Sequence, residues 1–252
     1  MKIFDDILDE LWTHFNNYKD EEWVTKDSIP ILFFGNINKY LQSPTKIITV
    51  AKNPSHNEFP DKIKRFETDL NLLNNNEKYL NTLSQYFKQN PLTEWFNSFE
   101  KLLQYLNASY YEDNYPSNSG NTFDWKPREN IVLHTDICSP LSTNPTWSLL
   151  LKNNPNLKSE LSKAGALLWH KLIQILKPDI ILLSAASYTR EMVSKDLTWE
   201  NLILPNEFKK KHELKLSNYK KSKLFWISPL IKPISFKDED KSILAEIIKK
   251  HS

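Results

Sequence analysis

Four short apolar runs, with helical patterns between them, constrain the fold of this chain most strongly. The runs are residues 47–51, 131–137, 180–184 and 224–228. Each is nearly continuous in apolar residues, which is typical of central strands that are covered on both faces. Strands that alternate with helices indicate a parallel sheet with right-handed crossovers. We therefore predict an α/β fold of three layers, α/β/α, with a central four-stranded parallel sheet.

The segments between these runs contain helical periodicity. Apolar residues recur every three or four positions in segments 95–106 and 161–176, and Pro178 ends the second helix before the next strand. An acidic helix is expected over residues 4–18 and a terminal helix over 239–250. We expect a single domain over residues 1–252, in which 1–44 form an N-terminal helical extension and 45–252 the core.

Composition excludes several kinds of site. The net charge of +2 excludes a uniformly basic nucleic-acid binder, so any such surface must come from local clusters of charge. The three glycines are isolated from one another, which excludes a P-loop and a dinucleotide fingerprint. The single cysteine, Cys138, excludes an internal disulfide and a multi-cysteine metal site. We expect no metal and no cofactor.

The sequence also predicts where the protein works. The first residues are too acidic for a signal or transit peptide, and no apolar run approaches the length that spans a membrane. We expect a soluble, cytoplasmic protein with no membrane association. No obligate protein partner is evident from the sequence.

Three polar loops follow predicted strands, where open α/β sheets place their ligand sites. They contain Asn53-Pro54-Ser55, the run from His134 through Asp136 to Leu141, and Ser228-Pro229-Leu230. In this order and spacing, from about residue 45 to 235, they resemble the active-site motifs of the uracil-DNA glycosylase superfamily. The resemblance implies a fold of that type and a DNA N-glycosylase that flips a base and leaves an abasic site. DNA would be the partner.

The resemblance assigns a role to individual residues. Asn53 would hold the attacking water, and Asp136 would read the base edge or activate the water instead. Phe59 would stack on the flipped base, since extruded bases are held between aromatic or apolar faces. Trp226 falls where the family has a base-binding histidine, unless the register slips to Ile227. Further DNA contacts are expected from Ser55, Ser228, Pro229, Leu230 as an apolar wedge, and Lys232.

Each of these residues also has a purely structural interpretation. Asn53 could cap a turn before Pro54, Phe59 could be a core aromatic, and Asp136 could cap the end of a strand. The lysines around Lys220 and Lys221 alternate with apolar residues. They form either a solvated face or a set of phosphate contacts leading into the last loop.

The predicted substrate depends on Asp136. An ionised carboxylate only accepts hydrogen bonds, which suits the amino group of cytosine better than uracil. We therefore expect a modified cytosine, such as the hydroxymethylated or glucosylated base of phage DNA, ahead of uracil. The setting would be repair or antiviral defence. The alternatives are a uracil-DNA glycosylase in base-excision repair, a non-catalytic DNA-binding relative, and an unrelated nucleotide-binding enzyme.

Overall fold

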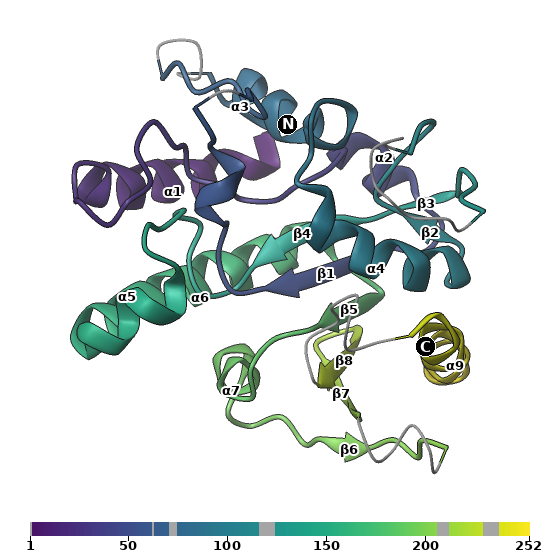
Figure 1. The fold of residues 1–252 in the computed structure, drawn as a ribbon. Helices are drawn as coiled ribbons and strands as arrows, with labels where there is room; N and C mark the ends of the chain where they lie inside the picture. The colour runs from purple at the N-terminus through teal and green to yellow at the C-terminus, as the bar shows by residue number, and fades with distance from the viewer. Residues whose placement is uncertain (1, 62, 71–74, 116–123, 206–211, 229–236) are drawn as a thin grey trace.

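A mixed six-stranded sheet forms the centre of the molecule (Figure 1), with strand order β4-β1-β5-β8-β7-β6. The computed structural model describes residues 2–61, 63–70, 75–115, 124–205, 212–228 and 237–252. Four strands run parallel, namely β4 (Leu133–Asp136), β1 (Ile47–Ala51), β5 (Ile180–Leu183) and β8 (Ser222–Ser228). The hairpin partner β7 (Glu213–Tyr219) and the edge strand β6 (Glu200–Asn201) add antiparallel pairs.

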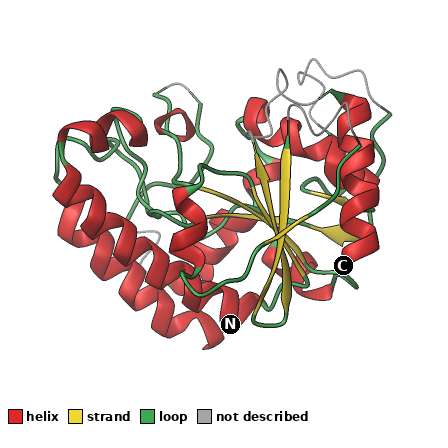
Figure 2. Cartoon of the chain, turned by 90° about the horizontal axis from the view of Figure 1, so that it is seen from below, coloured by secondary structure: helices red, strands yellow, loops and turns green. Residues whose placement is uncertain are grey.

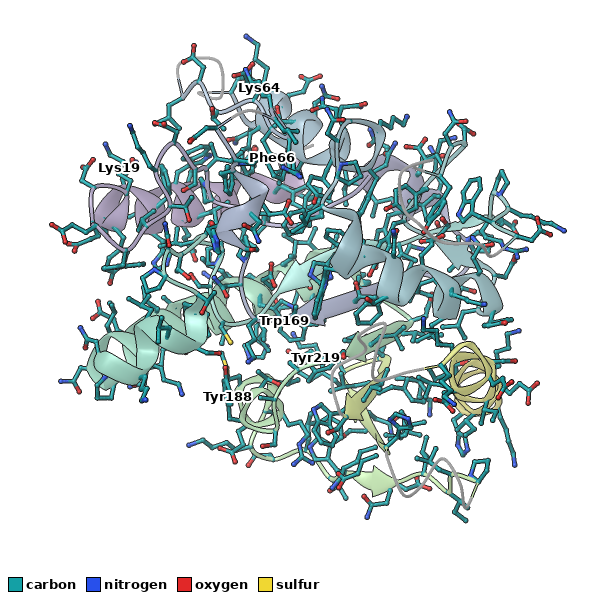
Figure 3. All side chains as sticks on the ribbon, in the orientation of Figure 1. Lys19, Lys64, Phe66, Trp169, Tyr188 and Tyr219 are labelled. Carbon is teal, nitrogen blue, oxygen red and sulfur yellow. The ribbon has the colours of Figure 1, made fainter. Side chains whose placement is uncertain are left out.

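Helices lie on both faces of the sheet, which Figure 2 shows edge-on. On one face lies α6 (Pro155–Leu176), whose Trp169 donates from Nε1 to Thr135 Oγ1 of β4 at 3.1 Å (Figure 3). On the other face lies α4 (Thr93–Tyr105), whose Phe96 ring is 5.2 Å from the ring of His134. Because successive residues of a strand point to opposite faces, Thr135 and His134 identify the two sides.

The remaining helices extend these two layers. Helices α1 (Asp5–Tyr18), α5 (Trp147–Asn153) and α7 (Tyr188–Val193) contact α6, and α9 (Asp238–His251) contacts α4. The shorter elements are η1 (Lys2–Phe4), α2 (Ile37–Gln42), η2 (His56–Glu58), α3 (Asn76–Ser84) and η3 (Tyr86–Lys88), together with a separate two-stranded sheet of β2 (Ala108–Ser109) and β3 (Asn130–Ile131). No helix in the described part of the chain is long and apolar enough to cross a membrane.

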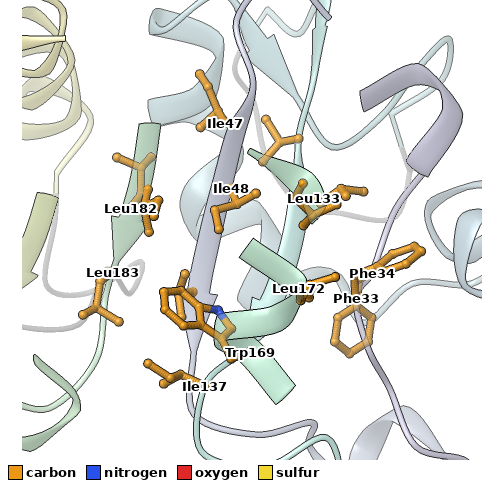
Figure 4. Packing of buried hydrophobic residues seen from close by; sticks show 14 of the residues in the cluster. Phe33, Phe34, Ile47, Ile48, Leu133, Ile137, Trp169, Leu172, Leu182 and Leu183 are labelled. Carbon is orange, nitrogen blue, oxygen red and sulfur yellow. The ribbon is translucent and has the colours of Figure 1, made fainter. Parts of the chain in front are cut away.

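One hydrophobic core joins the sheet to its helices and to the N-terminal segment (Figure 4). Ile48 and Leu182 of the sheet are fully buried, and so is Phe33 from the N-terminal segment. The backbone of Phe34 exchanges two hydrogen bonds with His134 of β4. The N-terminal segment therefore covers the outer edge of the sheet, where unpaired backbone groups would otherwise be exposed.

The sequence-based prediction of the α/β fold and of the four parallel strands is confirmed, but the number of strands in the sheet is wrong. Residues 213–219 of the lysine-rich segment before β8 form strand β7, which extends the sheet with an antiparallel pair. Its apolar positions, such as Leu214 and Leu216, are buried, while Glu213 is exposed. This alternation is that of a strand with one solvated face. The predicted run 131–137 also divides, into the end of β3 and β4.

Candidate functional site

The carboxyl ends of β1 and β4 lie side by side, because Ala51 pairs with Asp136 in the parallel register. Asn53 follows β1 directly, and Ser228 ends β8 at the same edge of the sheet. These polar residues therefore lie at the same end of the parallel strands. Which of them can meet one ligand depends on their individual surroundings.

Asn53 joins two loops. Its Nδ2 donates to the backbone oxygen of Pro54 at 3.0 Å, and to the backbone oxygen of Leu141 and Thr143 Oγ1 at 3.3 Å each. The Oδ1 atom accepts no hydrogen bond from the described residues. Asn53 therefore has a structural role, and its side-chain oxygen Oδ1 remains available to a ligand.

Asp136 is enclosed, since only 2% of its side chain is exposed. Its buried Oδ1 has no hydrogen-bond partner among the described residues. Burial, and then the neighbouring Glu58, raise the pKa of Asp136 well above its ordinary value. This direction runs against the premise of an ionised Asp136, because desolvation disfavours the charged form. A neutral carboxyl both donates and accepts, as an amide does.

Glu58 is the second carboxyl of this region, and it lies in η2 with 4% of its surface exposed. The Tyr86 hydroxyl donates to its Oε2 at 2.6 Å. Burial raises the pKa of Glu58 to about 7, against the opposing effects of Tyr86 and Arg65. Sequence reasoning gave Glu58 no role, since its position in a polar loop carried no sign of burial. A carboxyl with this pKa can act as an acid or a base near neutral pH.

A buried chain of polar groups continues from Asp136 into the protein. His134 Nδ1 is 2.8 Å from Thr49 Oγ1, which is 2.6 Å from the Tyr110 hydroxyl. His134 Nε2 lies 3.8 Å from Asp136 Oδ1. Burial lowers the pKa of His134 to about 3, so the imidazole is neutral and this approach is no ion pair.

A cavity of about 360 Å³, the larger cavity, opens beside Glu58. Phe59 and Phe66 line it, with their ring centroids 5.5 Å apart and stacked. Phe66 also stacks on Tyr86, with ring centroids 5.1 Å apart. Phe59 and Phe66 therefore give the larger cavity an aromatic wall.

Charged side chains also line the larger cavity. They are Lys26, Lys64 and Arg65, together with Asp27 and Asp61. Lys64 pairs with Glu67 at 3.0 Å, whereas the buried Nε and Nη1 of Arg65 have no hydrogen-bond partner in the described part of the chain. Figure 3 shows Lys64 and Phe66 on the same side of the molecule. Arg65 is the cation in the lining that is best suited to an anionic group.

A second cavity of about 170 Å³, the smaller cavity, is lined by polar side chains that include Asn53, Ser55, His56 and Thr143. Ser55 Oγ also accepts from the backbone of Asn57 at 3.2 Å and so caps η2. The turn η2 separates the two cavities, because His56 lines one and Glu58 the other. The structure therefore does not bring Asn53 and Phe59 into one pocket.

Trp226 does not line either cavity. It is 4% exposed, and its Nε1 donates to the backbone oxygen of Ala185 at 3.0 Å. The Arg190 guanidinium covers its ring at 4.3 Å. The single donor of the indole is therefore already used within the protein.

The residues predicted to contact DNA do not all lie near Asp136. Lys220 and Lys221 form the turn between β7 and β8, at the edge of the sheet opposite to Asp136. Pro229, Leu230 and Lys232 lie outside the described residues. No group of three His, Cys, Asp or Glu side chains in the described part could hold a metal ion.

Comparison with known proteins corrects the resemblance inferred from the three loops. No protein-family model matches the chain. A curated protein described as "Glutathione S-transferase", from Plasmodium yoelii yoelii, is 28% identical over 161 residues, which cover 60% of this chain and 69% of that protein. Neither comparison supports membership of the uracil-DNA glycosylase superfamily, and that inference is wrong. Short motifs such as Asn-Pro-Ser and Ser-Pro-Leu recur in unrelated strand-end turns.

Proposed function

We propose that the protein hydrolyses the N-glycosidic bond of a non-standard pyrimidine in DNA and leaves an abasic site. One observation carries the proposal: Glu58, a buried carboxyl with a raised pKa, lines a cavity together with Phe59 and Phe66, and the buried carboxyl Asp136, which interacts electrostatically with Glu58, also has a raised pKa. Strongly perturbed carboxyls at a cleft are typical of functional sites.

Binding of a flipped base follows from the shape of the larger cavity. Its volume of about 360 Å³ lies within the range of small-molecule sites. The base would stack on Phe59, as extruded bases do on aromatic faces. Arg65, whose buried Nε and Nη1 have no partner in the described region, would bind a phosphate oxygen.

The two carboxyls would share the chemistry. When the bond between C1′ and the base breaks, its electron pair goes to the base, and water adds to C1′. The neutral Asp136 would donate a hydrogen bond to the departing base. Glu58, with a pKa of about 7, would accept the proton of the attacking water. Asn53 Oδ1 would orient a water at the neighbouring cavity.

The preferred base has to be tested, because a neutral Asp136 removes the argument against uracil. Its O–H could donate to N3 of cytosine while its carbonyl accepts from N4. It could equally donate to O4 of uracil and accept from N3–H. A modified cytosine and uracil are both candidates on these grounds.

The test uses duplexes that carry uracil, 5-hydroxymethylcytosine or glucosylated hydroxymethylcytosine, followed by alkaline cleavage of abasic sites. We expect cleavage of at least one. Asp136→Asn should retain activity within about tenfold, because the amide keeps a donor and an acceptor, whereas Glu58→Gln should lose roughly 100-fold. Lys249→Gln, at an exposed lysine in the last turn of α9, is the matched control and should change nothing.

Two results would contradict the proposal. DNA binding without cleavage of any duplex would indicate a non-catalytic DNA-binding protein. Unchanged activity in both Glu58→Gln and Asp136→Ala, with thermal melting as the check on folding, would remove the two carboxyls from the mechanism.

The similarity to the Plasmodium protein favours a second candidate, the transfer of glutathione to an electrophile. The cations of the larger cavity, Lys26 and Arg65, could bind the carboxylates of that tripeptide. Conjugation of glutathione to a chromogenic electrophile, without cleavage of any DNA duplex, would favour this function over the first.

A further inference from the structure

We propose that Arg190 of helix α7, together with Lys52 and Lys158 beside that helix, binds the phosphate backbone of the DNA strand. This α7 basic surface rests on the proposed function and extends it, because it names where the strand lies outside the base pocket. None of the three residues was singled out by the sequence.

Aromatic rings hold the three cations in place. Lys52 Nζ and Lys158 Nζ lie 5.7 and 4.8 Å from the ring centroid of Tyr188, the first residue of α7. The Arg190 guanidinium lies 4.3 Å from the Trp226 ring and 5.7 Å from the Trp199 ring. Cation–π contacts of this kind fix the direction of a long side chain without neutralising its charge. The cations are thus positioned in advance of any ligand.

The charges are also unpaired. No carboxylate forms an ion pair with Lys52, Lys158 or Arg190 within the described ranges of the chain. All three side chains are half-buried and so remain partly open to solvent. Lys215, which also lies over Trp226 at 5.8 Å, differs because Glu213 is 3.9 Å from it. We therefore leave Lys215 out of the surface.

Three different elements bring these residues to one edge of the sheet. Lys52 follows β1, Arg190 lies on the helix that follows β5, and Lys158 lies in the first turn of α6. Because α6 ends just before β5 begins, its N-terminus lies at the carboxyl edge, as Asp136 and Asn53 do.

The position of Lys158 has no evident benefit for the helix. A positive charge in the first turn opposes the helix dipole and costs stability. The same dipole adds positive potential to that of Lys52 and Lys158, and together they favour an anion at this point. A series of phosphates is the anion that an extended set of cations fits.

The α7 basic surface continues the smaller cavity. The Tyr188 hydroxyl neighbours the indole of Trp147, which lines that cavity beside Asn53. A strand on this surface would therefore pass next to the turn η2, with the base pocket on the other side of the turn.

The test measures binding of a short fluorescent duplex of ordinary bases over a range of salt concentrations. The triple variant Lys52→Gln/Lys158→Gln/Arg190→Gln removes three charges and leaves the backbone contacts in place. The logarithm of the binding constant decreases as the logarithm of the salt concentration rises. We expect this slope to become less steep by about 2 to 3 units in the triple variant, since each phosphate contact contributes about 0.9. The control Lys249→Gln/Lys250→Gln removes two exposed cations from the last turn of α9 and should leave the slope unchanged.

An unchanged slope in the triple variant, an equal fall in the control, or no DNA binding by the unmodified protein would overturn the proposal. Tighter binding of an RNA duplex of the same sequence would overturn its assignment to DNA. Base excision is measured separately, on modified duplexes. If the slope falls as expected but no base is excised, the surface stands and the proposed function fails.

Discussion

At the scale of single residues, Glu58 couples stability to pH. Its pKa in the folded protein is about 7, raised from 4.5 by burial. An unfolded chain loses this proton at lower pH than the folded protein does. The folded state therefore binds more protons between these two values, and its stability falls as pH rises through them. The full effect is about 3 kcal/mol, at 1.4 kcal/mol per pKa unit.

Replacement of Glu58 by glutamine should remove this dependence. In the unmodified protein, the contribution of Glu58 to the free energy of unfolding should be greatest below pH 4.5. This contribution should be lost as pH rises through 7. Glu58→Gln should be more stable than the unmodified protein at pH 8, with little difference at pH 5. Urea denaturation at both values measures this. A parallel loss of stability in both proteins on going from pH 5 to 8 would contradict the assignment.

At the scale of elements, α6 is fixed to the loop after β4 by close packing at Gly165. A Cβ at this position would lie 2.1 Å from the backbone oxygen of Cys138 and 2.8 Å from the backbone nitrogen of Ser139. Both atoms belong to the loop that directly follows Asp136. The approach of helix to backbone therefore determines how Asp136 is presented at the sheet edge.

Gly165→Ala should destabilise the protein although alanine favours helices. The added methyl group would meet backbone rather than a flexible side chain, and overpacking of this kind costs about 3 kcal/mol. Thermal unfolding measures the loss. Ala166→Gly, one position along the same helix, is the control and should cost only about 1 kcal/mol through helix propensity. Equal effects of the two changes would show that the close contact at residue 165 does not matter.

The hydrophobic pattern predicted the strands that are apolar on both faces. It did not predict a strand in which charged, exposed residues alternate with buried ones. Strands β1, β5 and β8 were visible as continuous apolar runs. Strand β7 was interpreted as a lysine-rich flank, because its partner strand is needed to show which of its faces is buried. The site was less predictable. Burial of Glu58 under Tyr86 and Phe66 arises from contacts between residues distant in the sequence, and no local pattern indicates it.

At the scale of the whole molecule, two kinds of buried ionisable group act in opposite directions. Burial raises the pKa of Glu58, Asp136 and Glu100 and lowers that of His134. The carboxyls make the protein less stable as pH rises. His134 makes it less stable as pH falls from 6.5 towards 3, because the unfolded chain then binds a proton that the folded protein excludes.

Between about pH 4.5 and 6.5 the three carboxyls outweigh His134, so stability should fall as pH rises through this range and be greatest at or below its acid end. Unfolding free energies measured from pH 3 to 9 test this. His134→Gln should flatten the acid side of the curve and leave the alkaline side unchanged. A maximum at or above pH 8 would mean that the carboxyls are ionised in the folded protein.

The turn η2 (His56–Glu58) stands between the two cavities, with His56 on one side and Glu58 on the other. A nucleotide with its base in the larger cavity must carry its backbone across this turn to reach the smaller cavity and the α7 basic surface. A stacked duplex resists so sharp a bend, whereas a mispaired or unstacked nucleotide makes it at low cost. The ease with which the DNA strand bends would then select the substrate before the protein makes any contact with the base.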